Sequence, residues 1–507
     1  MGKSRSGAAK LNVISGFLNE FVIIVFGLLV PRIVLSYFGS TYNGLLNSVV
    51  QFMSFSVVLR SGLGVVTTAA LYKPLAQGDE ETISSIMVAT DKFMQKIGWL
   101  LAGIIVVFSL LYPLLVLDEF GYLFSLSLIL IIGAASWVEN MFSVKYKVLL
   151  QADQKTYIQT FVTMIAYLLS NVFAIVLMVA GCSIHIVRLG MLLGLMTTPF
   201  MLKVYVDRHY NIDWKAPANN VAIKSRWDAF AQQIATIANN NIPTVLMTFL
   251  FPLKEISVYT VYHMVVKNIN QLIGNSVVGI RATFGNMYAR GEYDHLKKRF
   301  RDVEWLVFAV NAVLYSVTAI MLTPFVLIYT DGVTDADYNR FWFGLLMTVS
   351  CCVYTTRLPY QMIAEAVGRF KETRTSAALE VVVNIIVSVA CAPFMGLNAM
   401  VVGSLVGGLV RVGNLIWVCN RKVLKISLWE PVKNYVIYLG VSAALVFVIS
   451  CVIGIRCDNL TDWVLTAIPV TAVVTTVVLL ASAVFNLKQL QGIAAHFLKR
   501  RNNRKRG

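Results

Sequence analysis

Charged residues are scarce in this sequence. Only 14% of its 507 residues are Asp, Glu, Lys or Arg, whereas 57% are hydrophobic and the mean hydropathy is +0.71. Soluble domains average about 25% charged and about 45–50% apolar residues. The composition therefore excludes an ordinary soluble domain and predicts a membrane protein.

Motifs of catalysis and metal binding are missing as well. The glycine-rich GSLVGGLV at Gly403 lacks the Lys and Ser/Thr of a phosphate-binding loop, and neither HExxH nor GxSxG occurs. The seven cysteines form no CxxC and do not pair at metal spacing with the five histidines. We therefore expect no enzyme, no metal and no organic cofactor.

Long apolar runs make up most of the chain. A membrane-spanning helix needs roughly 20 mainly apolar residues, and about fourteen stretches qualify. The basic N-terminus precedes an apolar run too long for a secretory signal and without a cleavage site, so we expect an uncleaved first helix. The predicted spans are Leu11–Phe38, Leu45–Leu71, Phe93–Leu117, Tyr122–Val148, Ile158–Ala180, Ile184–Val206, Asp228–Phe251, Ile256–Tyr288, Val303–Tyr329, Phe341–Ala366, Ser376–Phe394, Asn398–Val418, Tyr435–Ile455 and Trp463–Phe485.

Positive charge is concentrated on one side of the predicted spans. With the N-terminus inside, the opposite loops carry only Lys254, Arg340 and Arg456, and most other Lys and Arg fall in cytoplasmic segments such as the tail LKRRNNRKRG. This asymmetry predicts that both termini are cytoplasmic. It also explains most of the net charge of +17, so we expect the basic segments to contact anionic lipid and not nucleic acid.

Two weak internal matches predict a duplication. LAQGDEETI at Leu75 resembles YARGEYDHL at Tyr288, and QADQKTY at Gln151 resembles VGRFKET at Val367 at nearly the same offset. We therefore predict two pseudo-symmetric six-helix lobes, 1–206 and 228–419, joined by a cytoplasmic linker, 207–227. Two appended helices in 420–485 and a basic tail, 486–507, follow. Transporter sites commonly lie near the midplane between such repeats.

Polar side chains inside these helices mark a candidate path. In the span Ile256–Tyr288, five of them fall within roughly 140° of one another on an ideal helix. The alternative is that such groups only form hydrogen bonds between helices. The predicted polar set is Lys267, Asn270, Gln271, Asn275 and Arg281 in that span, Asp228, Gln232, Asn239 and Asn240 in the span before it, Asn47 and Gln51 in the second span, and Glu380 and Asn384 in the eleventh.

Arginines within the spans need compensation. Arg60, Arg281 and Arg357 lie deep, where each costs about 2.5–3.5 kcal/mol unless water or a counter-charge is near. Arg32 is close enough to the outer face to reach it. One interpretation is pairing within the scaffold, and the acids available are Glu20, Glu139, Asp228, Glu365 and Glu380. The other is a cationic cavity for an anion, because the planar guanidinium can bind two phosphate oxygens.

Arg60 illustrates the two interpretations. On an ideal helix it points about 180° away from Gln51. Either Gly62 and Gly64 change the phase of the helix and turn Arg60 into the cavity, or Arg60 pairs with an acid such as Glu20 or Glu139 on a neighbouring helix.

The sequence resembles a known transporter family. FGSTYNGLLNSVVQFMSF with LRSGLGVVTTAALYKPLAQGDEE, and RLPYQMIAEAVGRFKET with ALEVVVNIIVSVACAPFMGLNAMVVGSLVG, are similar to Wzx-type polysaccharide flippases of the multidrug/oligosaccharidyl-lipid/polysaccharide (MOP) exporter superfamily. The resemblance implies an all-α bacterial inner-membrane protein whose two lobes surround a cationic cavity. It also implies alternating access that moves an undecaprenyl-diphosphate-linked oligosaccharide to the periplasmic leaflet, with a polysaccharide polymerase as a partner.

On this interpretation the diphosphate contacts Arg60, Lys267, Arg281, Arg357 and Arg32, and the amides contact the sugars. Glu20, Asp228 and Glu380 are candidates for coupling to an H+ or Na+ gradient, since no ATPase motif is present. Two alternatives of the same fold stay open: a lipid II flippase and a cation-coupled multidrug exporter. A membrane-embedded glycosyltransferase is disfavoured, because the longest predicted loop has only about twenty residues and such enzymes normally carry a large catalytic loop.

Overall fold

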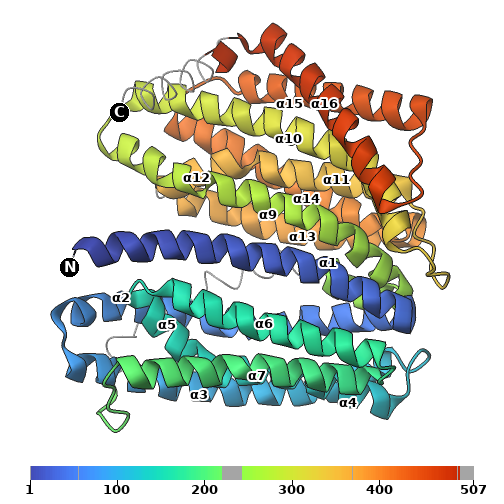
Figure 1. The fold of residues 1–507 in the computed structure, drawn as a ribbon. Coiled ribbons are helices and arrows are strands. Elements are labelled where there is room, and N and C mark those ends of the chain that lie inside the picture. Colours follow the sequence, from blue (N-terminus) through green and yellow to red (C-terminus); the bar gives the residue numbers. More distant parts are fainter. Residues whose placement is uncertain (1, 55, 220–242, 368, 488, 492–507) are drawn as a thin grey trace. The chain divides into compact units, whose positions relative to one another are not determined.

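The protein is built from helices. The computed structural model describes residues 2–54, 56–219, 243–367, 369–487 and 489–491, and every regular element within these ranges is helical (Figure 1). Eleven helical segments in this part of the chain are long and apolar enough to cross a membrane. The prediction of an all-α, multi-pass membrane protein is confirmed.

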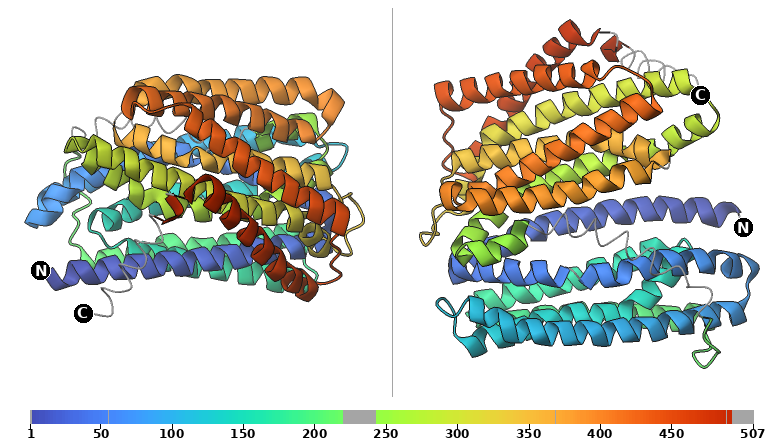
Figure 2. Two further views of the ribbon diagram at one scale, coloured as in Figure 1. Left: turned by 90° about the horizontal axis from the view of Figure 1, so that it is seen from above. Right: turned by 180° about the vertical axis from the view of Figure 1, so that it is seen from behind.

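The chain divides into two compact units, Met1–Ser257 and Val258–Gly507. Figure 2 shows the described helices from two further sides. Unit 1 contains α1 (Gly2–Ser54), α2 (Ser56–Gln77), α3 (Glu80–Leu111), α4 (Tyr122–Val138), α5 (Val144–Ala152), α6 (Thr156–Val179) and α7 (Ile184–His209), with short helical turns at Tyr112–Leu115 and Glu139–Ser143.

Unit 2 continues from α9, which begins in unit 1. Its elements are α9 (Leu253–Ala289), α10 (Tyr293–Tyr329), α11 (Phe341–Thr356), α12 (Leu358–Ala366), α13 (Phe370–Met395), α14 (Asn398–Trp417), α15 (Trp429–Phe447) and α16 (Leu460–Phe485). Single π-helical turns, η3 (Val418–Val423) and η4 (Val448–Ile453), extend α14 and α15.

The first two predicted spans are separated by a single residue. Gly39 has φ 83° and ψ 179°, a conformation that needs glycine, and it breaks α1 where a longer loop was expected. Helix α2 then ends at Gln77, past the predicted end of the second span at Leu71. The predicted boundary is therefore in the right place, but the connection is a kink.

Helix α3 begins at Glu80, well before the predicted start at Phe93, because its N-terminus is capped. Asp79 accepts hydrogen bonds from the Thr82 hydroxyl (2.6 Å) and from the Thr82 backbone N–H (3.0 Å). These bonds hold the pKa of the Asp79 carboxyl below its ordinary value. The amphipathic extension thus carries the helix beyond its apolar stretch.

The order of elements recurs along the chain. Helix α3 follows Gly78 and begins at Glu80, and α10 follows Gly291 and begins at Tyr293. Both glycines have positive φ, 70° and 72°. The starts of α3 and α10 are as far apart along the chain as the matching sequences LAQGDEETI and YARGEYDHL. The domain bounds drawn from those matches stay a prediction.

A G-x-x-x-G pair occurs at this same separation in both units. Gly190 and Gly194 lie on α7, which packs against α6, and Gly403 and Gly407 lie on α14, which packs against α13. A Cβ at Gly194 would lie 2.5 Å from the Ser170 Cα, and a Cβ at Gly407 would lie 2.6 Å from the Glu380 carbonyl oxygen. Small residues allow the two backbones of each pair to approach this closely.

We expect Gly407→Ala to destabilise unit 2 by about 1–3 kcal/mol, because the added methyl group meets backbone that cannot rotate away. Gly413→Ala on the same helix is the matched control, since nothing described lies within 4 Å of a Cβ there. Unfolding of the purified variants in detergent measures the difference. Equal stability of the two variants would contradict the close α13–α14 contact.

The described part of the predicted linker is packed on unit 1. Tyr210 donates a hydrogen bond to the Asp153 carboxylate (2.6 Å), the Asp213 N–H donates to the Ser84 hydroxyl (3.0 Å), and the Lys145 ammonium lies 4.8 Å from the Trp214 ring centre. Burial and the bond to Asp153 raise the pKa of the Tyr210 phenol. Residues 207–219 therefore lie against the helices of unit 1.

Candidate functional site

Arg357 is the predicted deep cation whose surroundings the structure describes in most detail. It lies at the break between α11 and α12, where Pro359 begins the new helix. Its Nη1 donates to the Glu380 Oε1 on α13 at 2.6 Å, and the two side chains are only 7% and 10% exposed. Two residues that were predicted for different roles, anion binding and ion coupling, thus form one buried ion pair.

Arg411 on α14 approaches the same carboxylate. Its Nε is 4.0 Å from the Glu380 Oε2, and its Nη1 donates to the Ser376 hydroxyl (2.7 Å) and to the Thr373 carbonyl. The Ser376 hydroxyl in turn donates to the Asn414 Oδ1 at 2.7 Å. We call Arg357, Glu380 and Arg411 the arginine–glutamate cluster.

The arginine–glutamate cluster holds two guanidinium groups for one carboxylate. The Arg357 guanidinium also lies 4.1 Å from the centre of the Tyr354 ring. Its Nε is buried and has no hydrogen-bond acceptor in the part of the chain that the structure describes. Buried donors normally find acceptors, so an additional acceptor, such as an anion oxygen, would complete this cluster.

Unit 1 pairs its cations differently. The Lys145 Nζ lies 2.7 Å from the Asp91 Oδ1, and the Lys147 Nζ lies 3.0 Å from the Glu139 Oε1. Glu139 was a predicted counter-charge for the deep arginines. It forms an ion pair with a lysine of its own span.

The polar face of α9 is partly described. Lys267 and Gln271 are exposed, and the Asn270 carbonyl group accepts a hydrogen bond from the Tyr315 hydroxyl on α10. The side chains of Asn275 and Arg281 lie outside the described residues. Asn270 therefore has a bond between helices, whereas Lys267 and Gln271 remain accessible in unit 2.

The amides of the second predicted span lie near the end of α1. Asn47 Nδ2 donates to the Asn43 carbonyl (2.8 Å), and Asn43 Nδ2 donates to the Ser257 hydroxyl (2.8 Å). Gln51 is half-buried, as are Arg32 and Glu20 earlier on the helix. Asn47 thus takes part in a local hydrogen-bond network, which is the alternative considered for these amides.

Several predicted site residues fall outside the described residues. The side chain of Arg60 is among them, although the helix α2 that carries it is continuous through Gly62 and Gly64. Whether Arg60 points into the cavity or towards a neighbouring helix therefore stays a prediction. Asp228, Gln232, Asn239 and Asn240 lie in 220–242, also outside the described residues.

Two residues of unit 2 were missed by the sequence reasoning. Arg411 lies in the predicted span Asn398–Val418 but was not assigned to the site, because nothing local connects it to Glu380 on a different helix. Glu304 was not counted among the internal acids, since it is the second residue of a predicted span. The structure buries it to 3% exposure. The sequence feature that could have identified Glu304 is the position of an acidic residue within the apolar stretch VEWLVF.

Comparisons with known proteins identify a fold. No protein-family model and no curated protein matches the sequence. The structure matches that of a lipid II flippase, MurJ, in an inward closed conformation, with a TM-score of 0.69 over 95% of this chain and 99% of that chain. The sequence identity is 14%. A multidrug resistance MATE family transporter of the MOP superfamily, in an inward-facing conformation, matches with a TM-score of 0.64 and 14% identity over 81% of this chain and 96% of its own.

The chain has the MOP fold. A further MOP superfamily transporter, from Pyrococcus furiosus and described as having a binding pocket of reversed polarity, matches with a TM-score of 0.53 and 12% identity over 83% of this chain and 97% of its own. The match to the lipid II flippase covers 95% of this chain, and the uncovered residues are too few to contain both α15 and α16. The match to the MATE transporter covers 81%, and its uncovered residues are numerous enough to contain both helices. The fold of this chain therefore corresponds to that of the lipid II flippase over 95% of its length.

Proposed function

We propose that the protein is a flippase that moves polyprenyl-diphosphate-linked oligosaccharides across the bacterial cytoplasmic membrane by alternating access. The observation that carries this proposal is the match to the lipid II flippase along nearly the whole of both chains, α15 and α16 included. We infer a Wzx-type substrate, a repeat unit of a surface polysaccharide, from the sequence resemblance. A gradient of H+ or Na+ drives the cycle, with both termini in the cytoplasm.

Cations recognise the diphosphate in this proposal. Lys267 on α9 is exposed, and Arg357 has a buried N–H without an acceptor among the described residues. Arg60, Arg281 and Arg32 supply further positive charge. Glu380 neutralises Arg357 at 2.6 Å, so a phosphate must compete with this carboxylate, and substrate binding is linked to the arginine–glutamate cluster.

The sugars contact amides in this scheme. The candidates are Asn47, Gln51, Gln232, Asn239, Asn240, Asn270, Gln271 and Asn275. Glu20, Asp228 and Glu380 are the candidates for ion coupling.

Lipid II is the second candidate substrate, favoured by the structural likeness to the lipid II flippase MurJ. Its diphosphate would need the same cations, so the two candidates differ at the sugar contacts. A cationic drug is disfavoured, because the residues proposed to contact the substrate headgroup, Arg60, Lys267, Arg281, Arg357 and Arg32, are cations and like charges repel.

We expect purified protein in proteoliposomes to move a fluorescent undecaprenyl-diphosphate oligosaccharide to the opposite leaflet, measured by quenching with a membrane-impermeant reductant. Arg60→Ala and Arg281→Ala should each slow this transfer about 10- to 100-fold, since a hydrogen bond to a charged group contributes about 1.5–3 kcal/mol. Lys73→Ala on α2 and Arg290→Ala, which follows α9, are exposed controls with the same charge change.

Parallel samples containing lipid II and a cationic dye distinguish the alternatives. Faster transfer of lipid II than of the repeat-unit lipid would assign the protein to lipid II. Transport of the dye alone would overturn the flippase proposal.

A further inference from the structure

Glu304 on α10 is a buried carboxyl group that forms no ion pair within 4 Å among the described residues. It is 3% exposed, and its side chain has one hydrogen bond in the described part of the chain, which it accepts from the Tyr360 hydroxyl on α12. Burial of a carboxylate without a direct ion pair is unfavourable, which favours the protonated form of the group. The proposed mechanism above does not use this residue.

One cation of α10, α12 and α15 acts on Glu304, and it is Arg301 on the same helix. The Arg301 Nε lies 2.9 Å from the Glu430 Oε2 on α15, so Arg301 is paired with a different carboxylate. Glu365 on α12 accepts a hydrogen bond from Gln361, and Lys433 on α15 is exposed. The remaining facing groups are neutral; they are Tyr435 on α15 and Cys419 in η3.

Three further helices, α9, α11 and α16, pack on α10. Helix α9 contacts α10 through Phe284, whose ring centre lies 6.0 Å from that of Phe300; its Lys267 is exposed, and the side chain of Arg281 lies outside the described residues. Helix α11 has no charged residue. The one charged residue of α16 is Asp462, which adjoins Trp463. The Trp463 indole bonds to α10 at the Met321 carbonyl, several turns beyond Glu304.

Unit 1 has an acid at the corresponding place, with a cation beside it. Asp91 lies as far from the start of α3 as Glu304 lies from the start of α10. Lys145 lies 2.7 Å from Asp91 and is followed by Tyr146. At the corresponding place in unit 2, Tyr360 follows Pro359. Unit 2 therefore has an acid and a tyrosine at these places but not the lysine.

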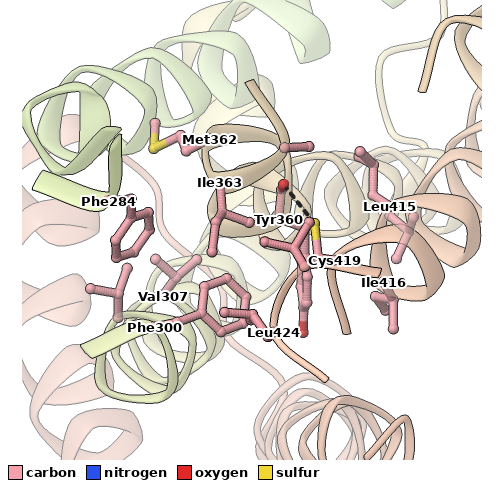
Figure 3. Packing of buried hydrophobic residues seen from close by; sticks show 14 of the residues in the cluster. Phe284, Phe300, Val307, Tyr360, Met362, Ile363, Leu415, Ile416, Cys419 and Leu424 are labelled. Carbon is pink, nitrogen blue, oxygen red and sulfur yellow. Dashed lines mark hydrogen bonds between the residues drawn. The ribbon is translucent and has the colours of Figure 1, made fainter. Parts of the chain in front are cut away.

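Tyr360 also connects Glu304 to the arginine–glutamate cluster. It lies on the short helix α12, just after Arg357 and the break that separates α12 from α11. Figure 3 shows Tyr360 beside Cys419, whose Sγ donates to the Tyr360 carbonyl at 3.0 Å, and Phe300 lies in the same cluster. A movement of α12 when Arg357 leaves Glu380 would separate Tyr360 from Glu304.

We propose that Glu304 is a proton-binding site, loaded while Tyr360 contacts it and emptied to water when α12 moves. One proton passes between the carboxyl group and water, and the Tyr360 hydroxyl keeps its own. This site deepens the proposed function, because it gives a route by which anion binding at Arg357 is linked to proton release. The proton-binding step itself does not depend on the nature of the substrate.

Infrared difference spectroscopy of the protein in nanodiscs, between acidic and alkaline buffer, tests the proton-binding step without any lipid substrate. Wild type should show a carbonyl band of a buried protonated carboxylic acid, and Glu304→Gln should lose it. Glu430→Gln, a nearby and partly exposed carboxyl group, is the control and should keep the band. The same band in Glu304→Gln would overturn the proposal, and Glu304→Asp should retain a shifted band, which excludes misfolding as the cause.

The coupling is tested by transfer of the fluorescent lipid in proteoliposomes with and without a pH gradient. Glu304→Gln keeps the acceptor for Tyr360 but cannot release a proton, so the acceleration of wild type by the gradient should be lost, with the rate at equal pH retained. Acceleration equal to that of wild type would overturn the link to transport. Failure of wild type to move any lipid would reject the proposed function and leave the infrared result standing.

Discussion

Removal of the Arg357 side chain in Arg357→Ala is expected to lower the free energy of unfolding by about 3–5 kcal/mol, the usual effect of breaking a buried ion pair. The Glu380 carboxylate would stay 10% exposed, with the Arg411 Nε 4.0 Å away as its nearest described cation. Arg411 cannot replace the lost contact fully, because its Nη1 is already bonded to Ser376 and Thr373. Unfolding in detergent, followed by circular dichroism, measures the change.

Glu380→Ala should destabilise the protein to a similar extent, because it leaves two buried guanidinium groups without their carboxylate. The double variant should lose less than the sum of the two single variants, which gives the coupling energy of the pair. Glu372→Gln, which removes an exposed ion pair with Arg369 from the same helix α13, is the control and should have little effect. Additive single variants would show that the pair does not stabilise the fold.

A second substitution of Arg357 distinguishes its two possible roles, which are phosphate binding and neutralisation of Glu380. If its function is to bind phosphate, flipping should fall in Arg357→Lys, which keeps the charge but loses the planar fork. If the residue only neutralises Glu380, Arg357→Lys should flip normally. The structure makes this comparison necessary, since the residue predicted to bind an anion already has a counter-ion.

The fold could be predicted because membrane helices are recognisable from local sequence. Apolar runs of about twenty residues give the spans one by one, and the break between the first two was placed close to Gly39. The length of the connection was not predictable, because a glycine with positive φ joins two helices without any loop. Helical segments with less apolar sequences, such as the first turns of α3, were not predicted. Their start is set by a capping hydrogen bond, here from the Thr82 N–H to Asp79, and not by hydropathy.

The candidate site was less predictable, because helical phase tells which residues share a face but not which helix they meet. Arg357 and Glu380 are 23 residues apart and on different helices, and their pairing follows from tertiary packing. The close approach of α13 and α14 at Gly407 brings Arg411 to the same carboxylate. From the sequence alone, Gly403 and Gly407 were considered only as part of GSLVGGLV, which lacks the Lys and Ser/Thr of a phosphate-binding loop.

Tyr438 anchors α15 to its neighbours and is the second position where a large effect is expected. It is 3% exposed, and its hydroxyl oxygen accepts hydrogen bonds from Trp305 Nε1 on α10 (2.7 Å) and from Asn486 Nδ2 (3.3 Å). With both lone pairs in use, its own hydrogen is directed to the Ser482 hydroxyl on α16, 2.8 Å away. One phenol thus connects three helices.

Tyr438→Phe should lower the free energy of unfolding by about 1–3 kcal/mol, because the buried Trp305 N–H loses its acceptor. Tyr438→Ala should cost about 3–5 kcal/mol, since it also leaves a cavity of aromatic size. Trp429→Ala on the same helix, 69% exposed, is the control for loss of an aromatic side chain and should change stability little. Chemical unfolding in detergent ranks the three variants.

The ranking also bears on what α15 and α16 do. If Tyr438→Ala unfolds no more easily than Trp429→Ala, these helices are not held to α10 through this phenol. If it unfolds more easily and flipping of the long-chain lipid falls with stability across the series, the two helices act as part of unit 2. The proposed function requires the second result, because the match to the lipid II flippase, which covers 95% of this chain, includes α15 and α16 in the fold.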